Sequence, residues 1–265
     1  MNILEQIIAD KQKEVQLKKQ VIPLNVWQRI LYYNEETTSL KESLLEEGAT
    51  GIIAEFKRKS PSKGIINNDA DIIEIVSAYN DEASGISILT DEKYFGGTND
   101  DMILSRDLVT APLLRKDFII DEYQLHEAKA IGADVILLIA ACLSKETVKQ
   151  LARKANQLGL EVLLELHDEK ELDHICNEVD IIGINNRNLK TFEVDIERSL
   201  RMAEQIPADK VKVAESGISS VENILLFRKH GFKGFLIGEN FMKEKDPAEA
   251  FYKFIQQLKP AKDAD

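Results

Sequence analysis

Charged side chains directly follow several short apolar runs of this 265-residue chain, and their types suit proton transfer. Apolar runs between helical segments are typical of parallel strands that are buried on both faces. In a closed barrel of such strands, all carboxyl ends meet at one rim, and these barrels do their chemistry there. Two lysines and three glutamates end such runs and indicate a proton-transfer site: Glu55, Lys57, Lys116, Glu165 and Glu215.

The spacing of two pairs also points to a site. Glu55 and Lys57 are two residues apart, so on a strand their side chains share a face. Asn185 and Arg187 repeat this spacing after a later apolar run. A surface pair would be an ordinary charged edge, but both pairs follow buried-strand patterns, so we favour a site. Burial tends to lower the pKa of lysine and raise that of glutamate, which favours acid–base chemistry near neutral pH.

Lys116 lies within the segment Leu-Leu-Arg-Lys-Asp-Phe. Strand alternation predicts that Lys116 points into the barrel, whereas Arg115 and Asp117 point toward the surrounding helices. A strand-end glutamate such as Glu165 is sometimes only a structural partner for a lysine. That explanation does not account for five such groups at one rim.

Glycine turns follow the last two expected strands, at Ser216-Gly217 and at Gly238-Glu239. Barrels of this kind often bind phosphate on backbone N–H groups after strands seven and eight. Ordinary turn glycines are the alternative, but glycines at both strands favour phosphate. The segment 60–64 is interpreted as a mobile loop, and the aromatics of 94–97 and Phe118 either pack in the core or hold a planar aromatic substrate.

Eight strand-then-helix units predict a single (β/α)8 TIM barrel, in the α/β class. We expect strands at 51–57, 85–90, 112–117, 134–140, 161–165, 180–185, 212–215 and 234–238. Helices of 10 or more residues should begin near Asp69, Asp100, Asp121, Ser144, Asp168, Asp195, Ser219 and Pro247, most of which are good N-caps. The competing doubly wound sheet needs a glycine-rich phosphate turn, and the sequence has neither GxGxxG nor a P-loop.

Residues 1–48 should form an N-terminal helical extension that packs on the barrel domain of residues 49–265. The spacing of 2–20 predicts an amphipathic helix, and a second helix is expected from Ser39 to Glu47, ended by Gly48. The pattern leaves three roles open for this extension: a lid, a plug at the bottom of the barrel, or a helix for a partner.

Composition excludes several classes of function. The formal net charge of −12 argues against nucleic-acid binding but leaves a local basic pocket for an anionic small molecule. The four histidines (His126, His167, His174 and His230) have no metal-ligand spacing, and Cys142 and Cys176 are expected to be small buried thiols. No apolar stretch approaches the roughly 20 residues of a membrane span, and no signal peptide is evident, so we expect a cytoplasmic protein without a membrane partner.

The chain resembles the indole-3-glycerol-phosphate synthase family over nearly its whole length. The segments 53–64, 89–97, 114–118, 183–192 and 214–218 carry this resemblance. Glu-Phe-Lys-x-x-Ser-Pro-Ser (55–62) together with Asn-x-Arg-x-Leu (185–189) is specific to the family. Ala-Glu-Ser-Gly (214–217) is weaker, because other phosphate-binding barrels carry similar turns.

The resemblance implies a reaction and a role for each site residue. The substrate would be 1-(2-carboxyphenylamino)-1-deoxyribulose 5-phosphate, which closes its pyrrole ring, loses CO2 and water, and gives indole-3-glycerol phosphate without cofactor or metal. Lys116 would be the general acid and Glu165 the general base, with Lys57 either a second lysine or a group that orients the substrate carboxylate. Glu55 would position the lysines. Substrate contacts would come from Ser60, Phe118, Asn185, Arg187, Glu215, Ser216, Gly217, Gly238 and Glu239.

Two alternatives stand beside this interpretation. One is another phosphoribosyl-handling barrel isomerase, which typically needs a single carboxylate and a second acid–base group. The other is a non-catalytic barrel that binds a ligand. The set of two lysines and three glutamates, with the N-terminal extension, favours the synthase over the isomerase, and Lys116 together with Glu165 favours it over the non-catalytic barrel. We expect a monomer, with weak self-association as the alternative. One departure concerns Gly238-Glu239-Asn240, where some family members have a small hydroxyl residue.

Overall fold

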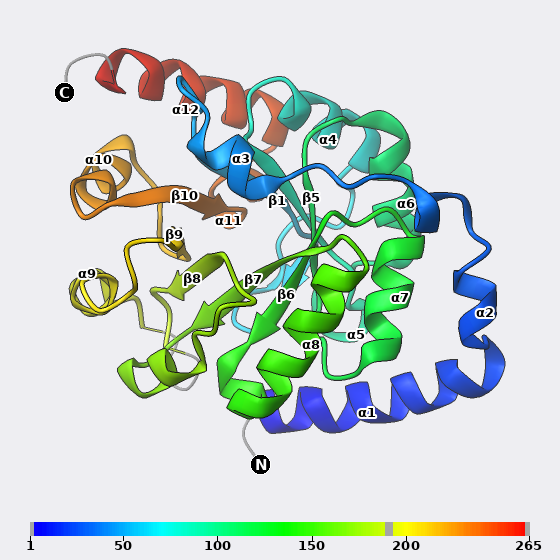
Figure 1. Ribbon diagram of the computed structural model, residues 1–265. Helices are drawn as coiled ribbons and strands as arrows, with labels where there is room; N and C mark the ends of the chain where they lie inside the picture. The colour runs from blue at the N-terminus through cyan, green and yellow to red at the C-terminus, as the bar shows by residue number, and fades with distance from the viewer. Residues whose placement is uncertain (1–2, 189–192, 263–265) are drawn as a thin grey trace.

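Eight apolar strands pair side by side in chain order and close into a parallel barrel, as the computed structural model of residues 3–188 and 193–262 shows (Figure 1). The last strand pairs with the first, with Ile52 opposite Phe235. The strands are β1 (Ile52–Phe56), β4 (Gly85–Leu89), β5 (Leu113–Lys116), β6 (Val135–Ile139), β7 (Glu161–Leu166), β8 (Ile181–Asn185), β9 (Val211–Glu215) and β10 (Phe232–Ile237). The predicted (β/α)8 barrel is therefore confirmed.

The strands are buried on both faces, which is why they read as continuous apolar runs. Side chains such as Ile53, Leu163 and Val213 fill the barrel interior. Their neighbours, such as Ile52 and Leu164, face the layer between the strands and the helices. Both faces avoid water, so the alternation of a half-exposed sheet is absent from the sequence.

Helices cover the outside of the barrel, and side-chain caps start most of them. They are α4 (Ile72–Asn80), α6 (Asn99–Leu108), α7 (Glu122–Ala130), α8 (Lys145–Gln157), α9 (Ile196–Ala203), α10 (Val221–Lys229) and α12 (Pro247–Lys262). Asp121, Ser144 and Asp195 are N-caps, as predicted.

Three predicted helix starts were wrong by one or two residues. Asp71 caps α4 in place of Asp69, Thr98 caps α6 in place of Asp100, and Ser220 caps α10 in place of Ser219. Thr98 is the N-cap of α6 because it forms a capping box with Asp101, which satisfies two free N–H groups at once. The length expected for α4, α7, α9 and α10 was also wrong, since these helices have eight or nine residues.

The helix expected after Asp168 is not an α-helix. Asp168 caps a 3-10 helix of six residues, η3 (Glu169–His174). Its sequence is mostly charged and offers Leu172 as its main apolar contact, so little packing supports a longer helix.

The N-terminal segment spans both ends of the barrel (Figure 1). Helix α1 (Ile3–Val21) lies at the carboxyl end, and the chain then runs past α7 through α2 (Leu24–Trp27) and η1 (Leu31–Asn34). It ends in α3 (Leu40–Leu45) at the amino end of the strands. There Leu40 fills the space next to Gly85, where a Cβ would lie 2.5 Å from its Cδ1. The sequence left a lid and a bottom plug as alternatives; helix α1 lies at the end expected of a lid and α3 at the end expected of a plug, and their roles remain predictions.

Short elements shape the carboxyl rim. The segment that we interpreted as a mobile loop is an antiparallel hairpin of β2 (Lys59–Ser60) and β3 (Gly64–Ile65). The remaining short helices are η2 (Ala140–Cys142), α5 (Glu92–Phe95) and α11 (Glu239–Met242). Within the described ranges, no helix is both long enough and apolar enough to cross a membrane.

Candidate active site

One cavity of about 280 Å³ opens at the carboxyl end of the barrel. The residues that the sequence nominated come together in its lining, although they are spread over 185 positions of the chain: Glu55, Lys57, Ser60, Lys116, Phe118, Glu165, Asn185, Arg187, Glu215, Ser216, Gly217, Gly238 and Glu239. Strand ends meet here because the barrel is parallel. Their individual roles remain predictions.

A buried cluster of charges lies at the base of this cavity. The Nζ of Lys116 is 3.1 Å from Oε2 of Glu165 and 3.2 Å from Oε2 of Glu215. Asn185 Nδ2 donates a hydrogen bond of 3.1 Å to the other oxygen of Glu165. Strands β5, β7, β8 and β9 each supply one of these groups, so the rigid barrel fixes their geometry.

The pKa shifts that we expected from burial were wrong for two of these groups. Burial alone would lower the pKa of Lys116, but attraction by Glu165 and Glu215 outweighs it and raises that pKa. Burial alone would raise the pKa of Glu165, but Lys116 and His167 hold it well below its usual range. Only Glu215 follows the expectation, because burial and repulsion by Glu165 raise its pKa to about 8. At neutral pH the cluster therefore holds a lysine cation, one carboxylate and one carboxylic acid.

Glu55 and Lys57 form a second pair beside this cluster. Lys57 Nζ lies 2.6 Å from Glu55 Oε1, and the Glu55 side chain is buried. Gly238 makes room for it, because a Cβ at that position would lie 2.6 Å from the same oxygen. The structure thus gives this glycine a reason that sequence reasoning missed, namely the close approach of Glu55.

Arg115 points away from the cavity, as strand alternation predicted, and Asp117, although it borders the cavity, turns its carboxylate toward Arg115. Arg115 is fully buried and lies 2.7 Å from Glu127 of α7 and 3.1 Å from Asp117. Its Nε donates to Thr90 Oγ1 at 3.1 Å. The side chains before and after Lys116 are therefore held on the outside of the strand, which orients the lysine inward.

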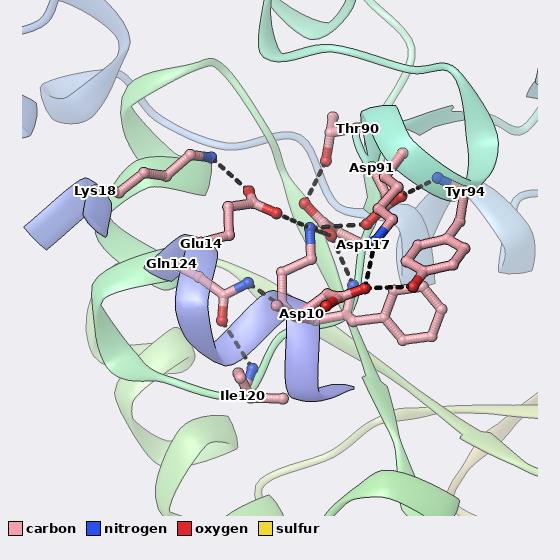
Figure 2. A network of polar contacts seen from close by, with 12 residues as sticks. Asp10, Glu14, Lys18, Thr90, Asp91, Tyr94, Asp117, Ile120 and Gln124 are labelled. Carbon is pink, nitrogen blue, oxygen red and sulfur yellow. Dashed lines mark hydrogen bonds and ion pairs between the residues drawn. The ribbon is translucent and has the colours of Figure 1, made fainter. Parts of the chain in front are cut away.

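Helix α1 is fixed over the site by a lysine that the sequence analysis did not single out. Lys11 is 2% exposed, and its Nζ lies 2.8 Å from Glu14, 2.9 Å from Asp91 and 3.0 Å from Asp117. Figure 2 shows Asp91 and Asp117 facing Glu14 and the rest of this network. Lys11 interrupts the apolar stripe of α1, four residues after Ile7, and that position was the available signal.

The cavity wall beside α1 is apolar. Ile3, Leu4 and Ile7 of α1 contribute to it, together with Leu137 and Ile139 of β6. Phe118 lies in the same lining, and its ring centroid is 6.0 Å from that of Phe95. This wall suits a planar aromatic group.

The other side of the cavity is formed by the turn after β9 and by the start of α11. Ser216 and Gly217 have φ angles of 66° and 70°. A Cβ on Gly217 would lie 2.5 Å from Val194 Cγ1, so both the backbone angle and the space require glycine. Arg187 Nη2 lies 3.6 Å from Glu239 Oε2 at the same rim. Residues 189–192, at the end of the segment 183–192, lie outside the described residues.

The side chains that could bind a metal ion do not form a cluster within the described part of the chain. Within residues 3–188 and 193–262, no three His, Cys, Asp or Glu side chains are placed to hold a metal ion. Cys142 and Cys176 are free thiols that are half-buried rather than fully buried, and burial raises the pKa of each.

Fold and site together define a (β/α)8-barrel protein whose carboxyl rim is built for acid–base chemistry on a small molecule. Comparison with known proteins identifies the family. The family model described as indole-3-glycerol phosphate synthase matches residues 4–254. A Bacteroides thetaiotaomicron protein of that name is 51% identical over 97% of this chain and 99% of its own length. A Caldanaerobacter subterraneus protein of the same name is 45% identical over 91% of this chain and 93% of its own. The chain belongs to the indole-3-glycerol phosphate synthase family.

Solved structures agree on the fold. A mutant tryptophan synthase alpha-subunit from Pyrococcus furiosus has a TM-score of 0.61 at 15% identity and covers 79% of this chain and 98% of its own. A thiamine phosphate pyrophosphorylase from the same organism has a TM-score of 0.57 at 16% identity, with 79% and 95% covered. At such low identity, these similarities support the barrel and nothing beyond it.

Proposed function

We propose that this protein converts 1-(2-carboxyphenylamino)-1-deoxyribulose 5-phosphate to indole-3-glycerol phosphate, CO2 and water. The observation that carries the proposal is the position of Lys116 Nζ between Glu165 and Glu215 at the base of a cavity that is apolar on one side. Membership of the family supports the same reaction.

The two sides of the cavity match the two ends of this substrate. The carboxyphenyl ring would lie against Phe118 and the apolar residues of α1 and β6. The phosphate would lie at the Ser216-Gly217 turn and at Gly238-Glu239, with Arg187 close by. The ketone between them would then face Lys116, and Ser60 on the hairpin would border the ring.

Lys116 would act as general acid in the ring closure. The aromatic carbon that bears the carboxylate attacks the ketone carbon, and the ketone oxygen takes a proton from Lys116. The raised pKa of Lys116 makes it a weak acid, but the alkoxide that forms is a stronger base, so the transfer remains favourable. Departure of CO2 returns its bonding electrons to the ring and restores aromaticity.

Glu165 would act as general base in the dehydration. It removes a proton from the methylene carbon while the hydroxyl takes a second proton and leaves as water. The low pKa of Glu165 keeps it ionised and ready to accept that proton. Two protons are supplied and one is recovered, so each turnover takes one proton from solvent.

Lys57 has two candidate roles in this scheme. It could supply the second proton, or it could orient the substrate carboxylate. Its 2.6 Å contact with Glu55 fixes its position in either case, and Glu55 would act as a positioning group for it. Asn185 would hold Glu165 through the hydrogen bond described above.

Indole fluorescence tests the proposal. Purified protein with the carboxyphenylamino substrate and no added metal should develop indole emission, and Lys116→Met should lose several orders of magnitude in kcat. Lys212→Met is the matched control, because Lys212 also lies on a barrel strand but bonds the backbone carbonyls of Ala203 and His230 away from the cavity. A folded wild-type protein without activity would overturn the proposal, as would a Lys116→Met variant with wild-type kcat.

Three further properties belong to this proposal. We infer that the protein works in the cytoplasm as a monomer, and that its substrate carries a phosphate. Residues 1–48 would act as an extension of the barrel domain 49–265, because α1 lines the cavity and α3 packs at the opposite end. Inorganic phosphate should protect the folded protein if the phosphate site is correct.

A further inference from the structure

His167 lies behind Glu165, outside the cavity lining. It follows β7 directly, and it is 7% exposed. Its Nε2 is 2.9 Å from Glu165 Oε1, the oxygen that does not face Lys116. The carboxylate of Glu165 is thus held from two sides, by Lys116 on Oε2 and by His167 with Asn185 on Oε1.

A second carboxylate faces the other ring nitrogen. His167 Nδ1 lies 3.9 Å from Glu171 Oε2, and the same oxygen accepts the backbone N–H of His167 at 2.6 Å. Glu171 belongs to η3, the short 3-10 helix, which brings this side chain back to the end of β7. The imidazole is thus buried between two carboxylates, one at each ring nitrogen.

Within the described residues, the polar contacts that the structure gives the ring nitrogens of His167 are those with the two carboxylates. Both are buried, and neither makes a well-aligned hydrogen bond to the part of the chain that the structure describes. Buried polar atoms of this kind call for an explanation, and a role at the neighbouring Glu165 provides one.

We propose that His167 is a positioning residue, which fixes the Glu165 carboxylate from behind and keeps it ionised as the base. This inference rests on the proposed function, because it concerns Glu165 in that reaction. His167 is not itself part of the cavity lining, so it acts on the reaction through Glu165.

The other charged groups around the ring are consistent with this role. Lys116 and Glu215 lie beyond Glu165, on the cavity side. The thiol of Cys142 on η2 interacts electrostatically with Glu165 and Glu171. Burial and these two carboxylates raise its pKa to about 12, so it stays neutral. The ring thus faces the carboxylates of β7 and η3.

Variants of His167 separate positioning from packing. His167→Ala removes the contact at 2.9 Å, and we expect kcat to fall about ten- to a hundredfold, the range for loss of a polar contact to a charged group. KM should stay within about twofold, because the ring does not reach the cavity. His167→Gln keeps an N–H donor at a similar reach and should recover part of the lost kcat.

The pH profile gives a readout that a packing defect would not change. Loss of the donor should make Glu165 easier to protonate, so the acid limb of kcat/KM should move to higher pH in His167→Ala and less in His167→Gln. His174→Gln is the matched control, because His174 lies in η3 and its ring nitrogens hydrogen-bond the backbone carbonyls of Glu171 and Leu143. It should keep the wild-type kcat and profile.

Several outcomes would overturn the inference. They are a His167→Ala variant with wild-type kcat and acid limb, a His167→Gln variant as impaired as His167→Ala, or a loss confined to melting temperature. An inactive wild-type protein would instead overturn the proposed reaction, so the two failures are distinguishable. Activity is compared at a temperature where circular dichroism shows each variant folded.

Discussion

Replacing Lys11 with methionine should detach α1 from the barrel. The substitution keeps most of the side-chain length but removes the charge that three carboxylates surround. Attraction by Asp117 and Asp91 raises the pKa of Lys11 despite its burial, so the native side chain is a cation at any physiological pH. Its loss removes one counter-charge from two buried carboxylates, Asp91 and Asp117.

The magnitude follows from what remains around those carboxylates. Removing one partner of a buried ion pair typically costs about 3–5 kcal/mol. Asp117 keeps Arg115, and Asp91 still accepts the backbone N–H of Tyr94, so we expect the lower end, about 3 kcal/mol. Burial of Ile7 and Val15 is worth about 3–6 kcal/mol in total, so the loss is comparable to the energy that docks the helix.

Urea denaturation and steady-state kinetics measure this effect. Lys11→Met should lose about 3 kcal/mol of unfolding free energy. It should also raise KM, because Ile3, Leu4 and Ile7 leave the cavity wall with α1. Lys19→Met is the matched control on the same helix: its amine pairs with Asp121 in an exposed contact, and loss of such a pair should cost less than about 1 kcal/mol.

Neutralising a freed carboxylate provides a further check. Asp91→Asn in the Lys11→Met background should recover part of the lost stability, since one unpaired charge is removed. A Lys11→Met protein with stability within 1 kcal/mol of wild type and an unchanged KM would refute the reasoning.

Three other predictions concern stability and phosphate binding. Glu215→Gln should flatten the pH dependence of the unfolding free energy. The raised pKa of Glu215 favours the folded state below about pH 4.5, and this advantage is lost as pH rises toward 8. Urea denaturation at pH 5 and pH 8 measures it, and an equal change in unfolding free energy for wild type and variant would contradict the prediction. Gly217→Ala should abolish the thermal protection given by inorganic phosphate, because a Cβ there meets Val194 and the φ of 70° is unfavourable; undiminished protection in a melting series would count against the phosphate turn. Leu40→Ala should cost about 2–4 kcal/mol in urea unfolding but leave kcat unchanged, since α3 lies at the end of the barrel opposite the cavity; a fall in kcat would show coupling between the two ends.

Much of the barrel and of the site was predictable because parallel strands leave a strong signal. A strand buried on both faces is an apolar run, and the charge that ends it marks the carboxyl rim. Lys116 and Glu165 therefore stood out in the sequence before any geometry was known. The inward direction of Lys116 followed from strand alternation alone.

What the sequence did not reveal depends on contacts between distant segments. The apolar stripe of α1 would fit many surfaces, and the partners of Lys11 lie at positions 91 and 117. The pKa of Lys116 is raised, whereas that of an isolated buried lysine would be lowered, because the strand pairing brings Glu165 and Glu215 close to it. The segment that follows β7 was predicted to be an α-helix, whereas it forms the 3-10 helix η3. Glu171 of η3 reaches His167.

The ion pairs of Lys11 with Asp91 and Asp117 can form only late during protein synthesis. Helix α1 leaves the ribosome before β4 and β5, since the acceptors Asp91 and Asp117 follow 80 and 106 residues after Lys11. At bacterial or eukaryotic translation rates this delay is about 5–20 s for Asp117. During that interval the apolar stripe of α1 has no barrel to cover. The helix that later shields the cavity from water is therefore itself exposed to water until β4 and β5 have been made.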